Sequence, residues 1–367
     1  MKVIVTGASG MVGKGVLLEC LDHSEISEVL SIGRKSLEIN HPKLKELLHK
    51  DFSEFAKIVE INTVLNKKNH FINEKLKRRI VKTINSSLSI KSVFSSNTNY
   101  FYELLHEIIN ENIVKIDLIH AISGENPTLE SLYINSSESI NHRLVINNKA
   151  FRDIVSIYNN SNLDKRLQGK IAVIENAITF KDDNVPSKND KIKIGFVGRW
   201  SKEKRPEIFL KIASRLKQTQ IPVEFIMAGI GMKSNIHLIN ENGISFEGEI
   251  TNDDALIKLY KSLTFILITS SREGFPMVII EAMANGVIPI CTDVGETKWL
   301  AKPDFSFYVP EYFSENDFVG AFKKIRNTPI EKLSDKSQLA RQTVLNEHTI
   351  EKMFKYYYGV YNNITNR

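Results

Sequence analysis

The stretch from Leu263 to Gly286 constrains the fold most, because a strand, a loop and a helix can be read there in direct succession. The apolar run 263–268 predicts a buried parallel strand. Pro276 suits the first turn of the helix that follows, and Gly286 suits its C-terminal cap. In α/β folds such a loop lies at the carboxyl edge of a parallel sheet, where ligands bind. The sequence therefore predicts an α/β fold with a ligand site in this loop.

Two carboxylates flank the predicted helix start. Glu273 lies in the loop and Glu281 lies in the helix, eight residues further on. Free backbone N–H groups at a helix start bind phosphate, and carboxylates accept hydrogen bonds from sugar hydroxyls. This pairing of anion donors with hydroxyl acceptors fits a nucleotide-sugar. Glutamates at this spacing also occur by chance in many helices, so two solvated side chains are the alternative interpretation.

A second loop carries cations instead. The run 192–197 predicts a strand, and Pro206 lies where a helix would begin. The loop between them presents Arg199 and Lys204. A departing nucleoside diphosphate develops negative charge, and fixed cations stabilise that charge without a metal ion. The alternative is a solvated basic loop with no ligand.

Together these segments resemble the donor site of retaining glycosyltransferases of family 4. Glycine turns at Gly229 and Gly248 follow two further predicted strands in the family's order. The resemblance covers about residues 60–365, and most of the matching motifs lie within 191–291. It implies the GT-B fold, in which two Rossmann-like domains with parallel sheets face a cleft.

The resemblance also implies a role for each matched residue. Glu281 would hold the ribose hydroxyls, and Glu273 the hydroxyls of the transferred sugar. Arg199 and Lys204 would hold the diphosphate, and His120 would lie near the acceptor or the transferred sugar, although a buried core histidine is its alternative. The further donor-binding residues that it implies are Gly198, Gly229, Gly274, Phe275, Pro276, Met277 and Val278.

The N-terminus carries a different signature. An apolar strand leads into a turn that contains Gly7, Gly10 and Gly13, a spacing that allows close approach of a pyrophosphate. This opening resembles that of extended or atypical short-chain dehydrogenase/reductases, and the likeness runs to about residue 55. Arg34 would then favour the 2′-phosphate of NADP. No tyrosine is followed by a lysine four residues later, so the catalytic pair of that family is missing.

We therefore expect a chimeric or incomplete N-terminal domain. Residues 1–56 would be a dehydrogenase-like fragment, and 57–180 the remainder of an acceptor domain. A polar, proline-containing linker at 181–191 would lead to a donor domain at 192–347. Residues 348–367 would form a last helix that crosses back to the N-terminal domain.

The formal net charge of +6 is concentrated in one stretch, because seven lysines and arginines fall within 67–84. Apolar residues recur there at helical spacing, which predicts a basic amphipathic helix. Such a helix can contact an anionic membrane, with roughly 1 kcal/mol gained per cation near the surface. We favour the alternative of a helix packed on a sheet with its charged side in water. No nucleic-acid-binding motif accompanies the charge, so nucleic acid is not an expected partner.

The remaining composition indicates a cytoplasmic protein. Cys20 and Cys291 lie in apolar patterns and are expected to be buried free thiols in a reducing compartment. No cysteine or histidine cluster has metal-ligand spacing, so no metal site is predicted. We find neither a signal-peptide layout nor an apolar run near the ~20 residues that span a bilayer.

The predicted function is that of a metal-independent, hexosyltransferase-type retaining glycosyltransferase without a cofactor. It would move a sugar from a nucleotide-sugar to a hydroxyl of a surface glycan or lipid-linked saccharide, as in polysaccharide biosynthesis. One alternative is an NADP-dependent reductase or epimerase. Another is a non-enzymatic nucleotide-binding protein that has lost its acceptor chemistry.

Overall fold

The computed structural model of the 367-residue chain describes most of its residues. The described residues are 2–6, 17–18, 20–22, 24, 26–33, 36–48, 77–78, 81–86, 92–96, 99–119, 122, 127–179, 192–218, 222–310, 315–353 and 355–356. They fall into two compact units. The first holds those within 1–145 and 150–173, and the second those within 146–149 and 174–362.

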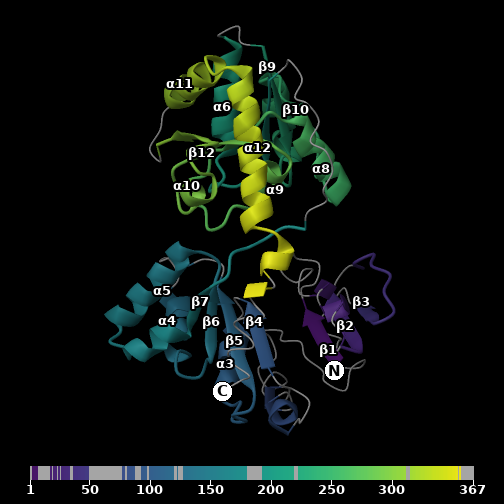
Figure 1. Ribbon diagram of the computed structural model, residues 1–367, viewed down its shortest axis with the longest axis vertical. Helices are drawn as coiled ribbons and strands as arrows, with labels where there is room; N and C mark the ends of the chain where they lie inside the picture. Colours follow the sequence, from purple (N-terminus) through teal and green to yellow (C-terminus); the bar gives the residue numbers. More distant parts are fainter. Residues whose placement is uncertain are drawn as a thin grey trace. The chain divides into compact units, whose positions relative to one another are not determined.

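The first unit contains two parallel sheets (Figure 1). One has the order β1-β2-β3, formed by β1 (Lys2–Thr6), β2 (Glu28–Gly33) and β3 (Leu44–Leu48). Leu17, Leu21, Ile26 and Val29 form its small buried core. β2 pairs in parallel with both β1 and β3. The positions of Gly7, Gly10, Gly13 and Arg34 lie outside the described residues.

The second sheet of this unit has the order β4-β5-β6-β7. Its strands are β4 (Ser92–Ser96), β5 (Val114–Ile119), β6 (His142–Val145) and β7 (Ile171–Val173). Its helices are α3 (Asn99–Leu105), α4 (Pro127–Asn135), α5 (Asn148–Asn160) and the 3₁₀ helix η2 (Lys165–Lys170). β7 ends at Val173, which pairs with Val145 at the end of β6, and Ile178 further on pairs with Thr349 instead.

A buried ion pair ties the middle of this sheet together. Asp117 on β5 and Arg143 on β6 are register partners, and both are almost fully buried. Arg143 Nη2 lies 2.9 Å from Asp117 Oδ2. Arg143 also donates to the Tyr133 carbonyl, the Tyr158 hydroxyl and the Ser136 hydroxyl. The guanidinium therefore finds partners along its whole edge, which offsets the cost of taking it out of water.

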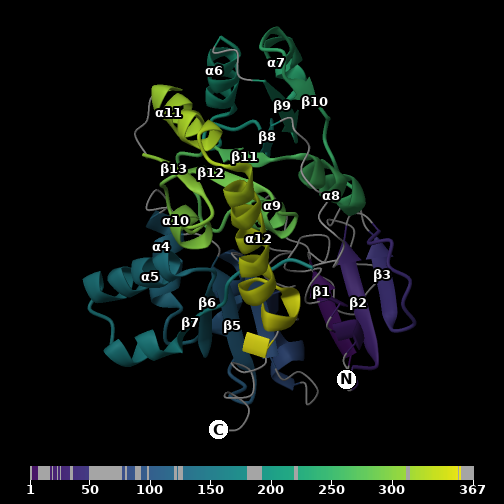
Figure 2. The same cartoon turned by 45° about the horizontal axis from the view of Figure 1, so that its top comes forward.

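The second unit is built on a six-stranded parallel sheet with the order β10-β9-β8-β11-β12-β13 (Figure 2). Its strands are β8 (Ile192–Val197), β9 (Val223–Ala228), β10 (Ser245–Phe246), β11 (Phe265–Ile268), β12 (Ile288–Thr292) and β13 (Phe307–Val309). The chain starts at β8 and adds β9 and β10 toward one edge of the sheet. It then returns to β11, beside β8, and adds β12 and β13 toward the other edge. The winding direction therefore reverses between β8 and β11, and ligands of doubly wound sheets bind at such a reversal.

Two groups of helices pack around this sheet. α6 (Pro206–Lys217) contacts α11 (Glu315–Arg326), while α9 (Met277–Ala284) contacts α8 (Asp253–Ser262) and α12 (Ile330–Glu347). The remaining helices are η3 (Lys233–Asn235), α7 (Ile236–Glu241) and α10 (Thr297–Leu300). The buried core includes aromatic side chains from three elements, Phe209, Phe225 and Phe265.

The predicted strand, loop and helix around Pro276 are confirmed. All four residues of β11 are buried, and β11 pairs in parallel with β8 and β12. Pro276 directly precedes α9 and caps it, and Gly286 follows the helix with a left-handed φ of 69°. Proline at a helix start and glycine after a helix end act through local backbone chemistry, which can be read directly from the sequence.

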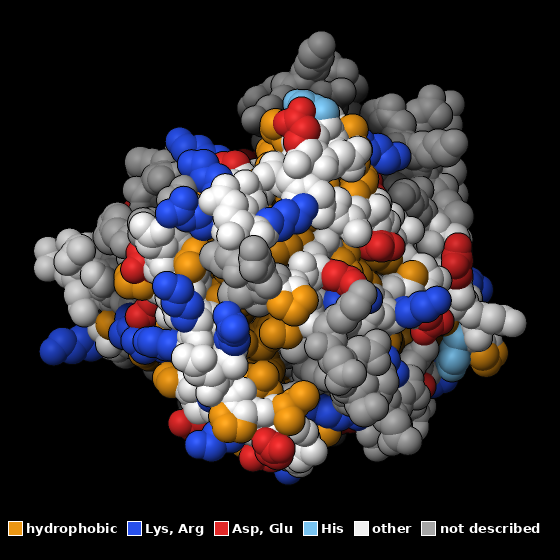
Figure 3. All heavy atoms as spheres, turned by 90° about the horizontal axis from the view of Figure 1, so that it is seen from above, with side chains coloured by type: hydrophobic (Ala, Val, Ile, Leu, Met, Phe, Trp, Pro, Cys, Tyr) orange, Lys and Arg blue, Asp and Glu red, His pale blue; other side chains and the backbone are white. Residues whose placement is uncertain are grey.

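The face of the molecule drawn in Figure 3 carries side chains of both signs. Figure 3 shows lysine and arginine side chains interspersed with aspartate and glutamate, and apolar side chains between them. No helix in the described ranges is long and apolar enough to cross a membrane. Of the predicted basic helix at 67–84, the structure describes residues 77–78 and 81–84, all helical. The linker at 181–191 lies outside the described residues, and so does most of 348–367 apart from 348–353 and 355–356.

Candidate functional site

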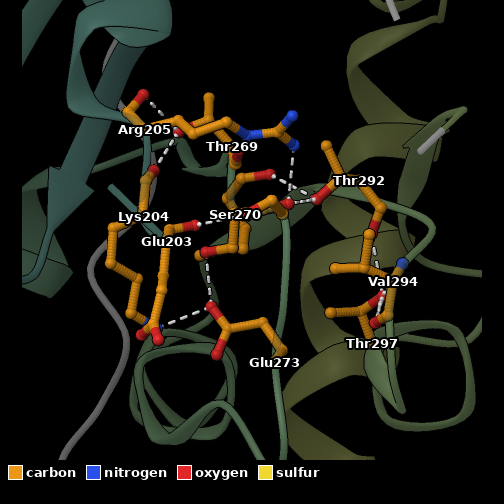
Figure 4. A network of polar contacts seen from close by, with 11 residues as sticks. Glu203, Lys204, Arg205, Thr269, Ser270, Glu273, Thr292, Val294 and Thr297 are labelled. Carbon is orange, nitrogen blue, oxygen red and sulfur yellow. Dashed lines mark hydrogen bonds and ion pairs between the residues drawn. The ribbon is translucent and has the colours of Figure 1, made fainter. Parts of the chain in front are cut away.

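Two loops meet where the sheet of the second unit reverses direction. One follows β8 and leads into α6, and the other follows β11 and leads into α9. The Ser271 N–H donates to the Glu203 carbonyl at 2.8 Å, and Thr269 Oγ1 donates to the Lys204 carbonyl at 2.7 Å. An exposed ion pair between Arg272 and Glu203, 2.8 Å apart, spans the same two loops. The two loops are thus held side by side by backbone and side-chain contacts (Figure 4).

Arg205 fixes the end of the first loop. Its backbone adopts a left-handed φ of 48°, and it caps α6 directly before Pro206. Its guanidinium donates to the Thr269 carbonyl at 2.6 Å and to the Ser270 carbonyl at 2.8 Å (Figure 4). A non-glycine residue in this conformation is unfavourable unless its surroundings hold it. We infer that these contacts hold the turn that presents Lys204. The sequence analysis did not assign this role to Arg205, because its position directly before Pro206 is the one local sign of it.

Lys204 and Glu273 form the centre of the site. Lys204 Nζ lies 2.6 Å from Glu273 Oε1, and Ser270 Oγ donates to the same oxygen at 2.5 Å (Figure 4). Glu273 is 8% exposed, whereas the Lys204 side chain is 23% exposed. A buried carboxylate with two donors on one oxygen has a fixed orientation. The two residues that the resemblance assigns to the diphosphate and to the sugar are therefore direct neighbours.

Gly295 lets a third segment approach this centre. A Cβ atom at Gly295 would lie 2.0 Å from the Glu273 carbonyl oxygen, and its φ is +58°. Both the space and the backbone conformation therefore require glycine there. Nothing in the sequence analysis indicated Gly295, because its neighbour lies in another loop.

The glycines at the carboxyl ends of β8 and β9 pack equally closely. A Cβ atom at Gly229 would lie 1.8 Å from the Gly198 carbonyl oxygen, and the Gly229 φ is +136°. The Gly229 N–H donates to the Gly248 carbonyl at 2.8 Å, so the turn after β10 is also tied in. The side chain of Arg199 next to Gly198 is exposed. The structure thus brings the predicted Gly198, Arg199 and Gly229 to one sheet edge.

The loop before α9 holds the remaining predicted donor residues. Asn147, which belongs to the second unit, donates from Nδ2 to the Gly274 carbonyl at 3.0 Å. Phe275 is buried, Pro276 caps α9, and Met277 and Val278 form its first turn. Glu281 lies one turn further along, and its Oε2 accepts a hydrogen bond from the Tyr260 hydroxyl at 2.7 Å. Asn147 and Tyr260 are residues that the sequence analysis missed.

An aromatic and charged cluster supports Phe275 from behind. The ring centroid of Phe275 lies 5.7 Å from that of His348, and the ring centroid of His348 lies 5.8 Å from that of Trp299. Both ring pairs meet edge to face. His348 Nδ1 is buried, has no hydrogen-bond partner among the described residues, and lies 3.6 Å from Glu175 Oε2. Burial lowers the pKa of His348 to about 4. Burial, with the charges of Glu347 and Glu296 next, raises the pKa of Glu175 to about 7.

These opposite pKa shifts predict opposite pH dependences in two variants. His348 binds a proton more readily in the unfolded chain, so its stabilising contribution is lost as pH falls from 6.5 through about 4. Glu175 binds a proton more readily in the folded chain, so its contribution is lost as pH rises from 4.5 through about 7. Between these limits, the two contributions to the free energy of unfolding of the wild type change in opposite directions with pH.

We expect His348→Phe to lose stability as pH rises from 4.5 to 7, and Glu175→Gln to lose stability as pH falls from 6.5 to 4. Each change should amount to about 2–3 kcal/mol. Urea unfolding across this pH range measures both, with the wild type giving the flatter profile. Slopes of the same sign in the two variants would contradict the assignment.

The remaining predicted site features are His120, the absence of a metal site and the two cysteines. His120 lies outside the described residues, although β5 ends directly before it at Ile119. Within the described ranges, no group of three or more His, Cys, Asp or Glu side chains could hold a metal ion. Cys291 is a buried free thiol, as predicted, whereas Cys20 is only partly buried.

Residues 178–343 match the family model for glycosyl transferases group 1. The match covers a little under half of the chain. It contains Lys204, Glu273 and Glu281, so the loops described above lie within the matched segment. The prediction of a glycosyltransferase domain is confirmed at this level, and the narrower assignment to family 4 stays a prediction.

Curated relatives cover different shares of the chain. N-acetyl-alpha-D-glucosaminyl L-malate synthase of Bacillus anthracis is 24% identical over 286 residues, which are 70% of each protein. D-inositol 3-phosphate glycosyltransferase of Mycolicibacterium gilvum is 28% identical over 108 residues, which are 28% of this chain and 24% of that enzyme. The second likeness therefore concerns about a quarter of the relative's length.

Solved structures extend the likeness to the whole fold. A glycosyltransferase from Rickettsia africae has a TM-score of 0.71 at 17% identity, over 99% of this chain and 97% of its own. HepE of Anabaena, in complex with UDP and glucose, has a TM-score of 0.68 at 14% identity, over 99% of this chain and 100% of its own. The predicted GT-B fold with parallel sheets is confirmed. The dehydrogenase-like character of residues 1–56 stays a prediction.

Proposed function

We propose that the chain is a retaining glycosyltransferase that moves a sugar from a nucleotide-sugar to a hydroxyl acceptor. The observation that carries this proposal is the pairing of Lys204 with Glu273 at 2.6 Å, at the reversal point of a group 1 domain. A cation for phosphate and a carboxylate for sugar hydroxyls lie side by side there. A nucleotide-sugar has both groups in the same short stretch of its structure.

Each side chain then has a chemical task. Arg199, Lys204 and the N–H groups at the start of α9 hold the diphosphate and stabilise its charge as it departs. Among the described residues, no backbone acceptor is seen for the N–H groups of Met277 and Val278. Glu273 holds the transferred sugar, and Glu281 holds the ribose. Because these cations carry the phosphate charge, no metal ion is required for this step.

The acceptor hydroxyl attacks the anomeric carbon on the face from which the diphosphate departs. The bond to the acceptor oxygen forms as the bond to the phosphate oxygen breaks, and the hydroxyl proton passes to the leaving phosphate. The configuration of the anomeric carbon is retained, and no side-chain nucleophile is required. The fixed ion pair and helix start supply positioning and charge stabilisation, which are the main contributions in such transfers.

The comparisons guide the choice of donor and acceptor. HepE binds UDP and glucose, and TarM of S. aureus has been solved with UDP, so UDP-sugars are the first donors to test. We propose a hexose-type donor and a glycan or lipid-linked saccharide as acceptor. Residues 1–56 would supply strands to the acceptor domain rather than bind NADP, since the catalytic pair of dehydrogenases is missing from this chain.

Calorimetric titration with UDP, GDP and ADP, with their sugar conjugates and with NADPH, tests this function. We expect one nucleoside diphosphate to bind and to lose its binding in Lys204→Ala. The sugar conjugate that binds best is then assayed for release of the diphosphate in the presence of glycan acceptors. Binding of NADPH alone, abolished by Gly10→Asp, would overturn the proposal in favour of a reductase. Donor binding without transfer to any acceptor would indicate the non-enzymatic alternative.

A further inference from the structure

We propose that Tyr260 is a positioning residue that holds Glu281 in the orientation that selects ribonucleoside over 2′-deoxyribonucleoside diphosphates. This inference rests on the proposed function, because it takes Glu281 as the ribose-binding residue. Its structural basis is the hydrogen bond from the Tyr260 hydroxyl to Glu281 Oε2, 2.7 Å long. Tyr260 itself is 1% exposed, so the donor cannot turn away to water.

The sequence places Tyr260 on a rigid support. Asn252 caps α8 by accepting a hydrogen bond from the Ala255 N–H, and Leu259 and Tyr260 are the buried residues of the helix. The Leu263 N–H donates to the Tyr260 carbonyl at 2.9 Å, directly before β11. α8 in turn contacts α9, which carries Glu281. The backbone that carries Tyr260 is therefore fixed at the end of α8, and burial of the side chain limits movement of the ring.

The hydrogen bond leaves one carboxylate oxygen of Glu281 to a ligand. Within the described residues, Oε2 accepts from Tyr260, and no partner is seen for Oε1. Each carboxylate oxygen has room for a second hydrogen bond. A carboxylate that is held at one oxygen presents its other lone pairs in a constant direction. Two neighbouring hydroxyls of a ribose can then donate to it together, whereas a 2′-deoxyribose offers one.

The charge of Glu281 depends on the same contact. Burial raises the pKa of Glu281, the Tyr260 hydrogen bond lowers it, and the charge of Asp253 raises it further. Among the described residues, Tyr260 and Asp253, both on α8, are the polar groups that act on this carboxyl. Burial also keeps the pKa of Tyr260 well above its usual value, so its hydroxyl stays a donor. Loss of the hydroxyl therefore favours the protonated Glu281, which accepts hydrogen bonds less well.

A pair of hydroxyl deletions tests the inference. Tyr260→Phe keeps the ring and removes the hydrogen bond to Glu281. Tyr308→Phe is the matched control, because its hydroxyl donates to the carbonyls of Thr297 and Ala301 in the same unit and not to Glu281. Calorimetry with UDP, GDP and ADP and their 2′-deoxy counterparts, from pH 5 to 8, gives the ratio of the ribo and deoxy dissociation constants. Circular dichroism checks that each variant is folded.

We expect the wild type and Tyr308→Phe to prefer the ribonucleotide by about tenfold to a hundredfold, the range for one hydrogen bond to a charged group. In Tyr260→Phe this ratio should fall to a few-fold, and the pH below which binding weakens should rise. A wild-type ratio and pH profile in Tyr260→Phe would overturn the inference while leaving the proposed function intact. A wild type that binds no nucleoside diphosphate would overturn both.

Discussion

Sugar transfer is expected to fall by at least about a hundredfold in Glu273→Gln and in Lys204→Ala, while both variants stay folded. Lys204→Ala removes the ammonium group that we propose holds the diphosphate, so nucleoside diphosphate binding should weaken as well. Glu273→Gln keeps the shape of the side chain and removes its charge. It should retain binding of the bare diphosphate and lose the added affinity of the sugar conjugate. Initial rates and calorimetric titrations measure these effects.

A control for this pair lies in the same loops. Arg272→Ala breaks the ion pair with Glu203, in which the two side chains are 51% and 47% exposed. Exposed pairs contribute little, so this variant should transfer sugar at close to the wild-type rate. Wild-type turnover by Lys204→Ala or Glu273→Gln would sink the assignment of the site. A comparable loss in Arg272→Ala would mean that the loops, not the two side chains, determine the rate.

The largest loss of stability is expected from Arg143→Leu in the first unit. The change leaves Asp117 with a buried charge, and it also deprives Tyr158 and Ser136 of their donor. Removing one partner of a buried pair costs about 3–5 kcal/mol. Urea unfolding followed by circular dichroism measures the difference from the wild type.

Arg166 provides the matched control for this loss. It is also an arginine of the first unit and pairs with Glu138 at 2.8 Å, but its side chain is 66% exposed. Arg166→Ala should therefore cost no more than about 1 kcal/mol. Equal losses in the two variants would show that burial of the Asp117–Arg143 pair adds nothing to its contribution.

The strands and helix boundaries of the second unit could be predicted because their signals are local. The apolar run before Thr269 becomes β11, and Pro206, Pro276 and Gly286 lie at helix ends as expected. The Lys204 and Glu273 loops could be paired in advance through the family resemblance. Their contact follows physically from the strand order, which places β8 beside β11.

The supporting contacts could not be predicted in the same way. Arg205, Tyr260, Gly295 and His348 act on residues that are distant in sequence, and which loops meet depends on the completed sheet. The end of β7 shows this for a strand. Ile174, Ala177 and Ile178 are apolar like the residues of β7, yet the Ile178 N–H donates to the His348 carbonyl at 3.0 Å. The backbone of Ile178 therefore bonds to the segment after α12, which no local pattern could reveal.

The ion pair between Lys204 and Glu273 has a consequence for ligand choice. Lys204 and Glu273 are already each other's partner in an ion pair. A ligand that binds either residue must therefore replace that partner rather than contact an unpaired charge. A simple anion that takes Lys204 would leave the buried Glu273 carboxylate without its cation, at a cost of several kcal/mol. A bare nucleoside diphosphate bears the same cost, whereas a nucleotide-sugar brings hydroxyl groups together with its phosphates and can compensate both residues. Tighter binding of the nucleotide-sugar than of the bare diphosphate would then follow from the resting contact itself.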